Sequence, residues 1–470
     1  MMERQEPYTK ARVEVKHPYL ALLGLFLGGF CGLFGETSLN IALPQLMDTF
    51  HIGEGVIQWL VIGYMLVVGI VLPFATLLMK WFSVRKLTLF ALGAFIIGSL
   101  ISGFAPDFAF ILIGRMIQGI GAGLIMPLMF SVILVVFPVH KLGSAMGVAS
   151  LIVMFAPVTG PTVSGLILGA LSWRWIFFSF VAVSAAAAVF TAIYMVNPYE
   201  RTRPKIDGLS CLTSVVGFGG VVFGFSLISE YGFSVPVLSM LIVSVAAIAI
   251  YARRQLKTDV PILDLKALKV PRYRTGAILV ILNFGIILST MFILPQYIQN
   301  GRLIPVAAAG LIMLPGGLVN VAVSFLSGRL YDRFGAKYIV KIGFFASALS
   351  IILFLFTSTG SSAIYIIFCH ILLMIGVPLV MSPAQTDGLN ALPQRLSRDG
   401  STIINTMQQI LGALCTAIVT LLLGFGQILY SAHGGQNAAE AFTKGSHYGF
   451  CFALALAVTG FLVSFKIHSR

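Results

Sequence analysis

Residues 19–46 read YLALLGLFLGGFCGLFGETSLNIALPQL, and this stretch decides what kind of protein the chain is. Glu36 is its only charged residue. The stretch is longer than the roughly 20 residues with which a helix crosses the hydrocarbon core of a bilayer. It is also too long for the apolar core of a cleavable signal peptide. We therefore predict that residues 19–46 contain a transmembrane helix.

The composition of the whole chain favours the same class of protein. Of its 470 residues, 58% are hydrophobic and 10% are charged, whereas a soluble domain carries about a quarter charged residues. The 48 glycines and 37 phenylalanines are typical of membrane helices. The five cysteines lie singly within apolar runs, and no pair has the spacing of a metal site. We therefore expect no disulfide, no metal and no cofactor.

Thirteen further apolar runs have the length of a membrane span. Together with residues 19–46 they make fourteen spans, an even number that places both termini on one side of the membrane. The sequence therefore predicts an all-α integral membrane protein. The further runs are 56–79, 87–105, 108–137, 143–170, 175–195, 208–228, 233–252, 275–299, 303–328, 338–358, 362–383, 401–428 and 446–466.

The lysines and arginines predict the orientation of these spans. Of the 30 basic residues, 26 fall on the side that holds both termini, and only Arg174, Arg302 and Lys444 fall in loops on the other side. Arg115 lies within a span. Because basic loops stay in the cytoplasm, we predict that both termini and the loop 253–274 are cytoplasmic. The net charge of +14 therefore indicates topology and contact with anionic lipid, rather than a nucleic-acid partner.

Two of the predicted cytoplasmic loops resemble each other. Residues 328–337 read GRLYDRFGAK, and residues 76–86 read TLLMKWFSVRK, with Lys80 where the first loop has Asp332. Such repeats occur in transporters whose halves rock against each other. A glycine permits the tight turn, and an aspartate at a helix end can pair with an arginine or a helix N-terminus. We predict that this loop is a conformational latch formed by Gly328, Asp332, Arg333, Gly335 and Lys337, and that the copy around Lys80 is weaker.

Further motifs follow in order along the chain. Residues 115–123 read RMIQGIGAG, residues 160–165 read GPTVSG, residues 35–44 read GETSLNIALP, and residues 405–409 read NTMQQ. With the loop at 328–337, this series resembles the major facilitator superfamily, and in particular its fourteen-helix drug:proton antiporter family. The resemblance covers essentially the whole chain. Glu36 stands where that family has aspartate.

The resemblance implies a major facilitator fold of two six-helix bundles plus two extra central transmembrane helices. It implies five segments, namely a cytoplasmic N-terminus (1–18), an N-terminal bundle (19–195), two additional linker helices (208–252), a basic cytoplasmic loop (253–274) and a C-terminal bundle (275–466).

Glu36 is the only carboxylate deep inside a clear apolar run. It follows Tyr19 by 17 residues, which is roughly 26 Å along a helix and places it in the outer half of the span. A carboxylate in hydrocarbon costs several kcal/mol unless it faces a cavity, pairs or takes a proton. We therefore predict that Glu36 carries the coupled proton and contacts the substrate. A packing hydrogen bond through Asn40 is the structural alternative.

Arg115 is the second candidate for proton coupling. An arginine is always charged, so it cannot carry the proton, but it can hold a carboxylate ionised or organise a proton path with Gln118. A structural tie to backbone carbonyls is the alternative. Small Gly160 and Gly165 allow close helix packing, and Pro161 bends its helix. We expect this segment to seal the path against proton leakage.

Polar residues within the apolar runs are candidates for contacts in a central cavity. Each is also suited to a hydrogen bond between helices. His370 is a further titratable group inside a span, and we place Asp387 in a loop at the inner surface. The candidate substrate-binding residues are Glu36, Asn40, Gln118, Asn283, Gln296, Asn320, Asn405 and Gln408.

The chain lacks a nucleotide-binding G-x-x-x-x-G-K-[ST] motif, so uphill transport would draw on an ion gradient. The resemblance implies a monomeric, multi-pass protein of the bacterial plasma membrane that exchanges protons for small lipophilic or cationic compounds by alternating access. A dedicated exporter of one antibiotic, metabolite or lipid precursor is the alternative within transport. A membrane-embedded enzyme or a sensor is the alternative from another class.

Overall fold

A computed structural model describes residues 17–137, 139–195, 197, 208–232, 234–258 and 263–467. In these residues the secondary structure is helical, without a strand, and 13 helices are long and apolar enough to cross a membrane. A further helix, α7, covers the predicted run 143–170. The predicted runs coincide with helical segments, although some runs are divided between consecutive helical elements, and the prediction of an all-α integral membrane protein is confirmed.

The first half of the chain forms one bundle, in which α1 packs against α6, α7 and α8, and α6 also packs against α4 and α5. Its helices are α1 (Pro18–Ser38), α2 (Leu43–Phe50), α3 (Glu54–Ile57), α4 (Trp59–Trp81), α5 (Val84–Gly103), α6 (Phe108–Val136), α7 (Val139–Ala170) and α8 (Arg174–Tyr194).

The second half forms the other bundle, in which α12 packs against α15, α16 and α17. Its elements are the 3₁₀-helix η2 (Leu265–Lys269), α12 (Pro271–Gln296), the π-helix η3 (Tyr297–Gly301), α13 (Val306–Phe334), α14 (Ala336–Leu355), α15 (Ala363–Asn390), α16 (Gln394–Ala432) and α17 (Ala438–Ser464).

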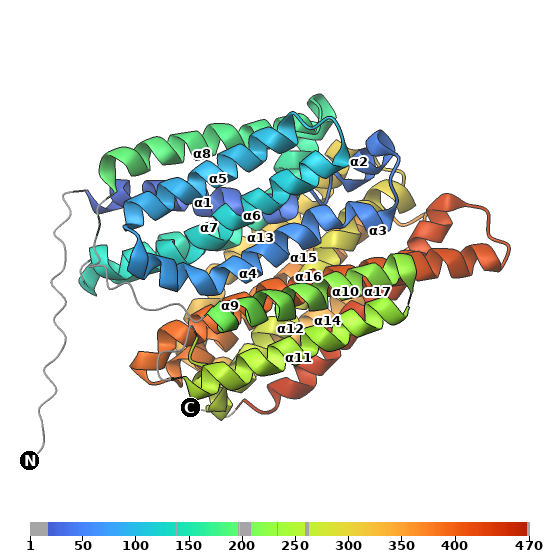
Figure 1. Ribbon diagram of the computed structural model, residues 1–470. Coiled ribbons are helices and arrows are strands. Elements are labelled where there is room, and N and C mark those ends of the chain that lie inside the picture. The colour runs from blue at the N-terminus through green and yellow to red at the C-terminus, as the bar shows by residue number, and fades with distance from the viewer. Residues whose placement is uncertain are drawn as a thin grey trace, which may run out of the picture.

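Two extra spans lie between the halves in sequence. The first is composed of α9 (Gly208–Ser214), the π-helix η1 (Val215–Gly219) and α10 (Gly220–Tyr231), and the second is α11 (Val235–Lys257). They pack against each other, and they contact α4 through η1 and α16 through α10. Since α4 and α16 come from different halves and also pack together, the extra spans cover one seam between the bundles (Figure 1).

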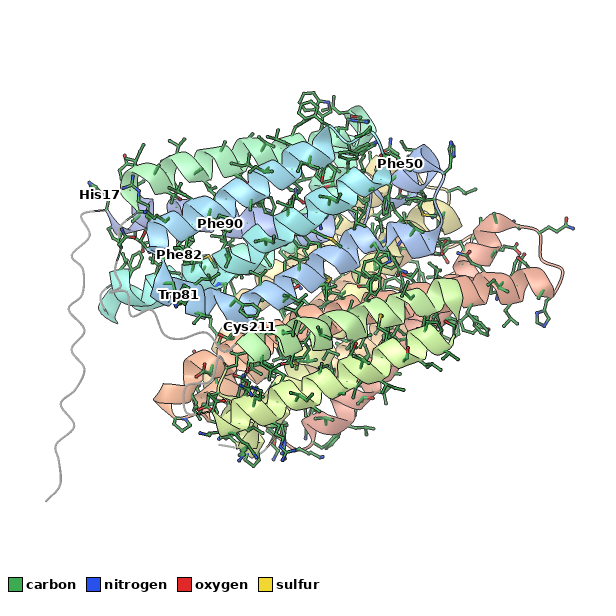
Figure 2. The ribbon with its side chains drawn as sticks, in the orientation of Figure 1. His17, Phe50, Trp81, Phe82, Phe90 and Cys211 are labelled. Atoms are coloured by element: carbon green, nitrogen blue, oxygen red, sulfur yellow. The ribbon has the colours of Figure 1, made fainter. Side chains whose placement is uncertain are left out.

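The predicted run 19–46 contains a transmembrane helix, as expected, but the run as a whole is not one continuous helix. α1 ends at Ser38, and α2 begins at Leu43 with Pro44 in its first turn. Proline has no amide hydrogen to donate, so it suits the start of a new helix better than the continuation of an old one. Figure 2 shows His17, before α1, and Phe50, at the end of α2, at opposite ends of the bundle.

The helices differ in how much of their apolar surface the protein itself covers. Within the most apolar window of each span, 72% of the residues are buried in the α12–η3 span but only 22% in α11. Large exposed side chains such as Phe90 stand on the outside of the bundle (Figure 2). Lipid must therefore cover α11 along most of its length, because apolar surface is stable only away from water.

Candidate functional site

Glu36 lies in the last full turn of α1, just before the chain turns into α2. Its side chain is 6% exposed, and Oε1 has no hydrogen-bond partner among the described residues. The side chain of Gln409, from α16 of the other bundle, lies beside this carboxyl group, and its Oε1 is likewise buried without a partner. The predicted proton site therefore stands where the two bundles meet.

Arg115 is fully buried in α6, and its guanidinium is held on every side. Nε donates to the carbonyl of Leu60 at 3.1 Å, Nη2 donates to the carbonyl of Gly35 at 3.1 Å, and Nη1 donates to Oε1 of Gln118 at 2.9 Å. The guanidinium carbon lies 3.9 Å from the centre of the Tyr64 ring. The positive charge is thus tied to α1 and α4, next to the predicted proton site at Glu36.

The contacts of Arg115 continue into a chain of buried hydrogen bonds. Nε2 of Gln118 donates to Oγ of Ser99 at 2.7 Å, and that hydroxyl donates to the carbonyl of Phe95 at 2.6 Å. The hydroxyl of Tyr64 donates to the carbonyl of Gly32 at 2.7 Å. These bonds connect α1, α4, α5 and α6, so the polar network fixes the four helices around Arg115.

Gly160 lies against α1 in the same turn as Glu36. A Cβ atom at this position would lie 3.2 Å from the amide nitrogen of Ser38 and 3.3 Å from the carbonyl oxygen of Phe34, and it would overlap the hydroxyl of Thr37. That hydroxyl donates to the carbonyl of Pro157 at 2.8 Å. The absence of a side chain at Gly160 therefore permits the contact between α7 and α1.

The next turns of α7 contact α13 of the other bundle. A Cβ atom at Gly165 would lie 3.1 Å from the carbonyl oxygen of Val306, and one at Gly310 would lie 3.0 Å from that of Pro161. The hydroxyl of Thr162 donates to the carbonyl of Gly310 at 3.0 Å. The segment with the sequence GPTVSG (residues 160–165) thus forms a close, glycine-lined contact between the halves.

Two further side chains bridge the halves beside the break in the first span. Nδ2 of Asn40 donates to the carbonyl of Met291 in α12 at 3.2 Å, while Oδ1 is buried without a partner among the described residues. Nε2 of Gln299 in η3 donates to the carbonyl of Ile41 at 3.1 Å. Asn40 contacts backbone of the second bundle rather than Glu36.

Two predicted cavity residues gather around Met381 of α15. Nδ2 of Asn283 donates to the carbonyl of Val377 at 3.1 Å and lies 3.9 Å from the sulfur of Met381, and Nε2 of Gln408 lies 3.7 Å from the same sulfur. Oδ1 of Asn283 is buried and unpartnered within the described structure. The interface of α12, α15 and α16 therefore contains a buried amide oxygen that can still accept a hydrogen bond.

The other predicted cavity residues lie apart from this cluster. Nε2 of Gln296 donates to the carbonyl of Phe292 in its own helix, and Nδ2 of Asn320 lies 3.5 Å from the sulfur of Met374. Asn405 is half-buried in α16. The structure thus does not bring all the predicted substrate-binding residues to one place.

The loop predicted as a latch connects α13 to α14. Gly335 ends α13 with φ +70°, and its amide donates to the carbonyl of Tyr331 at 2.8 Å. In the matching loop Ser83 begins α5 in an extended conformation, and its hydroxyl accepts from the amide of Lys86. Asp332 is exposed on the last turn of α13. The same helix connection is thus made by glycine in one half and by a serine cap in the other.

The remaining residues of the two loops are at the surface or lie outside the described side chains. The guanidinium of Arg333 lies 5.2 Å from the centre of the Phe334 ring, and Nζ of Lys337 lies 5.5 Å from that of Tyr338. A Cβ atom at Gly328 would meet open space. The side chain of Lys80 lies outside the described part of the structure.

Asp387 corrects an expectation, because it is not a loop residue. It lies within α15, with 5% of the residue exposed. Arg272 at the start of α12 donates to it twice, from Nε to Oδ2 at 3.0 Å and from Nη2 to Oδ1 at 2.6 Å. Such a forked pair is geometrically specific. Local sequence patterns do not reveal this pair, because the partners are 115 positions apart.

His370 lies at the contact between α15 and α13. The structure leaves both of its buried ring nitrogens without a hydrogen-bond partner among the described residues. Gly316 of α13 provides the space for the imidazole, because a Cβ atom there would lie 2.7 Å from Cε1 of His370. His370 is therefore a packed interface residue of the second bundle in this conformation.

Comparisons with known proteins agree with this architecture. The chain is 43% identical over 455 residues to the lincomycin resistance protein LmrB of Listeria monocytogenes, covering 96% of this chain and 97% of that protein. It is 43% identical to the lincomycin resistance protein LmrB of Bacillus subtilis, covering 94% of each chain.

Solved structures show the same fold at low sequence identity. A POT family transporter in complex with 5-aminolevulinic acid superposes with a TM-score of 0.71 at 13% identity, over 96% of each chain. The D-xylose–proton symporter superposes with a TM-score of 0.68 at 15% identity, again over 96% of each chain.

The helical bundles, the bacterial relatives and the sequence profile lead to one assignment. Residues 25–416 match the Major Facilitator Superfamily. The protein is thus a multi-pass protein of the bacterial plasma membrane and a transporter rather than an enzyme, which confirms the resemblance predicted from its motifs. The chain belongs to the Major Facilitator Superfamily.

Proposed function

We propose that this protein exports small lipophilic or cationic antibiotics in exchange for protons, with Glu36 as the proton-binding group. The observation that supports the proposal is the position of Glu36 in α1, beside Gln409 of the opposite bundle, with a carboxylate oxygen that has no partner among the described residues. An ionised carboxylate is costly there, and uptake of a proton removes that cost. Protonation can therefore change how the two bundles attract each other.

Arg115 favours the ionised form of Glu36 and therefore the release of the proton. Its guanidinium donates to the carbonyl of Gly35, so a permanent positive charge stands next to the proton site. No ion pair joins Arg115 to Glu36 in the described structure. The guanidinium donates its hydrogen bonds to carbonyl oxygens and not to Glu36. Its charge can therefore favour release of the proton from Glu36 without forming a permanent ion pair with the carboxylate. Loading and release of a proton at one residue are what a coupled exchanger requires.

The relatives suggest the substrate class. Proteins that share 43% of their residues with this chain, over nearly its full length, are named lincomycin resistance proteins. We therefore propose that lincomycin is among the compounds exported. Two buried amide oxygens, Oε1 of Gln409 and Oδ1 of Asn283, have no hydrogen-bond partner among the described residues. Each can accept a hydrogen bond from a hydroxyl or amine group of such a compound.

The experiment is transport into everted membrane vesicles that contain the full-length protein. With an imposed pH gradient, acid inside, we expect uptake of lincomycin and of a lipophilic cationic dye, and loss of both when a protonophore collapses the gradient. Uptake that survives the protonophore would contradict proton coupling. Uptake of lincomycin without the dye would favour a dedicated exporter of one antibiotic.

A further inference from the structure

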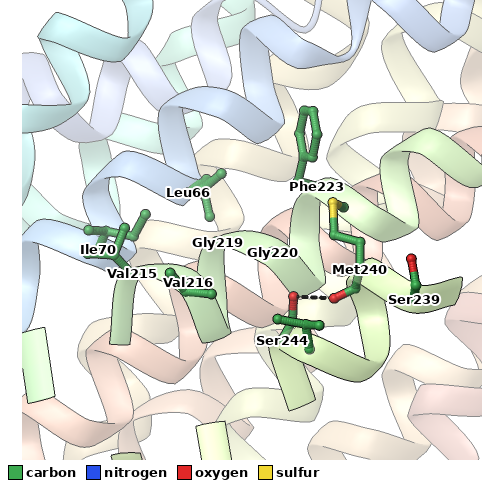
Figure 3. Close-up of a pocket in the computed structure, with 11 residues that line it drawn as sticks. Leu66, Ile70, Val215, Val216, Gly219, Gly220, Phe223, Ser239, Met240 and Ser244 are labelled. Atoms are coloured by element: carbon green, nitrogen blue, oxygen red, sulfur yellow. Dashed lines mark hydrogen bonds between the residues drawn. The ribbon is translucent and has the colours of Figure 1, made fainter. Parts of the chain in front are cut away.

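A groove of about 670 Å³ lies between α4 and the two extra spans (Figure 3). Its wall is almost entirely apolar, and the hydroxyl of Ser244 is occupied because it donates to the carbonyl of Met240 in the same helix. Val243, at the edge of the groove, is 58% exposed. The groove thus offers hydrocarbon contact and little opportunity for hydrogen bonding.

A second cavity, of about 340 Å³, lies at the end of α11 that the charge distribution predicts to be cytoplasmic. Arg253, Arg254 and Lys257 line it, together with the apolar side chains of Leu209 and Ile250. This cavity is lined by three positive charges together with apolar side chains, whereas the wall of the groove is almost entirely apolar. This cavity suits an anionic group that is attached to hydrocarbon.

The two cavities lie along the same side of α11. Val243, Ile250, Arg254 and Lys257 follow one another at intervals of seven, four and three residues, which return to one face of an α-helix. From Val243 to Arg254 the rise is about 16 Å at 1.5 Å per residue. That length is within reach of one lipid molecule whose headgroup and acyl chain are both bound.

From this alignment we infer that the extra spans form a binding site for an anionic phospholipid of the cytoplasmic leaflet. The headgroup phosphate lies among Arg253, Arg254 and Lys257, and an acyl chain lies in the groove against Phe223 and Val243. Basic clusters beside membrane helices bind anionic headgroups, and the apolar groove supplies chain contacts that a soluble anion would not use. Leu66 and Ile70 of α4 line the groove, and α4 packs against α16 of the other bundle, so the lipid would contact one side of the boundary between the bundles.

The experiment uses the full-length protein in detergent and native mass spectrometry with two lipids of identical chains, phosphatidylglycerol and phosphatidylcholine. We expect tighter binding of phosphatidylglycerol. In a variant with Arg253→Gln and Lys257→Gln its affinity should fall roughly 30-fold, because each cation near an anionic surface contributes about fivefold. Equal binding of the two lipids by the unaltered protein would overturn the proposal.

A matched control removes the same number of positive charges from the next element of the chain, η2. Lys266 and Lys269 are exposed in η2 and do not line the cavity, so Lys266→Gln with Lys269→Gln should leave the affinity unchanged. If this control loses as much affinity, a general basic surface and not the cavity binds the lipid. Gly219→Leu fills the groove, since a Cβ atom there meets only Ile70 at 3.6 Å, and it should weaken both lipids.

A second measurement needs no variant, in case the substitutions disturb folding. Phosphatidylglycerol with a photoactivatable group on its acyl chain is incorporated into vesicles with the unaltered protein and irradiated. We expect labelled peptides from the elements that line the groove, namely α4, η1, α10 and α11. Labelling confined to other helices would overturn the assignment of the groove.

Discussion

Arg115 donates a 3.1 Å hydrogen bond to the carbonyl of Gly35, the residue directly before Glu36 in the last turn of α1. The positive charge therefore acts on the proposed proton site through the backbone of α1 and through space, without an ion pair in the described structure. Glu36 and Arg115 can therefore have different roles, proton binding and the fixing of helix positions, which a salt bridge between them would couple. Glu36 can change its charge while Arg115 keeps α1, α4 and α6 in place.

Substitution of Glu36 tests the proton site. Glu36→Gln keeps the shape and removes the ionisable group, so we expect normal expression and folding but no gradient-driven export in everted vesicles. Glu36→Asp should retain part of the activity, because it keeps an acid and shifts it by one methylene. Full-rate uphill export by Glu36→Gln would show that another group carries the proton.

Arg115→Lys tests whether the forked geometry or only the charge is needed. A lysine cannot donate at once to the carbonyls of Leu60 and Gly35 and to Gln118, and a buried acceptor that loses its donor costs about 1–3 kcal/mol. We expect the initial export rate to fall roughly tenfold or more. Arg274→Lys, at an exposed position, is the control and should have no effect. If Arg115→Lys and Arg274→Lys have equal export rates, only the charge of Arg115 is needed and not its hydrogen-bond geometry.

Gly160 should matter for sealing and coupling rather than for binding. A leucine there would push α7 away from α1 and open a seam for protons, because membrane helices associate through close packing. We expect Gly160→Leu to bind substrate, to lose export and to dissipate a pH gradient faster without substrate. Gly160→Ala should be milder but measurable, because its Cβ atom displaces the Thr37 hydroxyl from Pro157. A Gly160→Leu variant that stays tight to protons would exclude this seal.

Asp332 is expected to control the change between conformations. Asp332→Asn should slow turnover several-fold and leave substrate affinity nearly unchanged, because its carboxylate is exposed on the last turn of α13, whereas Glu36 is buried within the protein. Parallel measurements of export rate and equilibrium binding separate the two effects. Lys80→Gln, in the matching loop that has no acid, is expected to change the rate less. Equal losses of binding and turnover in Asp332→Asn would indicate a pocket role or misfolding.

The predicted topology places both termini and the loop 253–274 in the cytoplasm. Lys266 is exposed in η2 of this loop, so a single cysteine at Lys266→Cys, with the five native cysteines replaced, should react with an impermeant thiol reagent only in opened cells. Labelling in intact cells would reverse the orientation and with it the proposed lipid leaflet.

Some of the site followed from local sequence. Glu36 stands out because a carboxylate within an apolar run is costly in a membrane unless it faces a cavity, pairs or takes a proton. The motif around Asp332 and Gly335 predicted a tight turn, and the structure has φ +70° at Gly335. Gln409 was not singled out, although its neighbour Gln408 was. Adjacent helix positions point about 100° apart, and only the packing of α16 against α4 decides which of the two lies beside Glu36.

By itself, the sequence determined the fourteen spans, the class of protein and the residues that are costly to bury, because these depend on the length and polarity of short segments. The tertiary structure alone decided which partners those residues have. Arg115 binds carbonyls from two other helices, Asp387 binds Arg272 from 115 positions away, and the extra spans lie over the seam between the halves. Such contacts join segments that are distant in the chain, and their geometry depends on how all the helices pack at once.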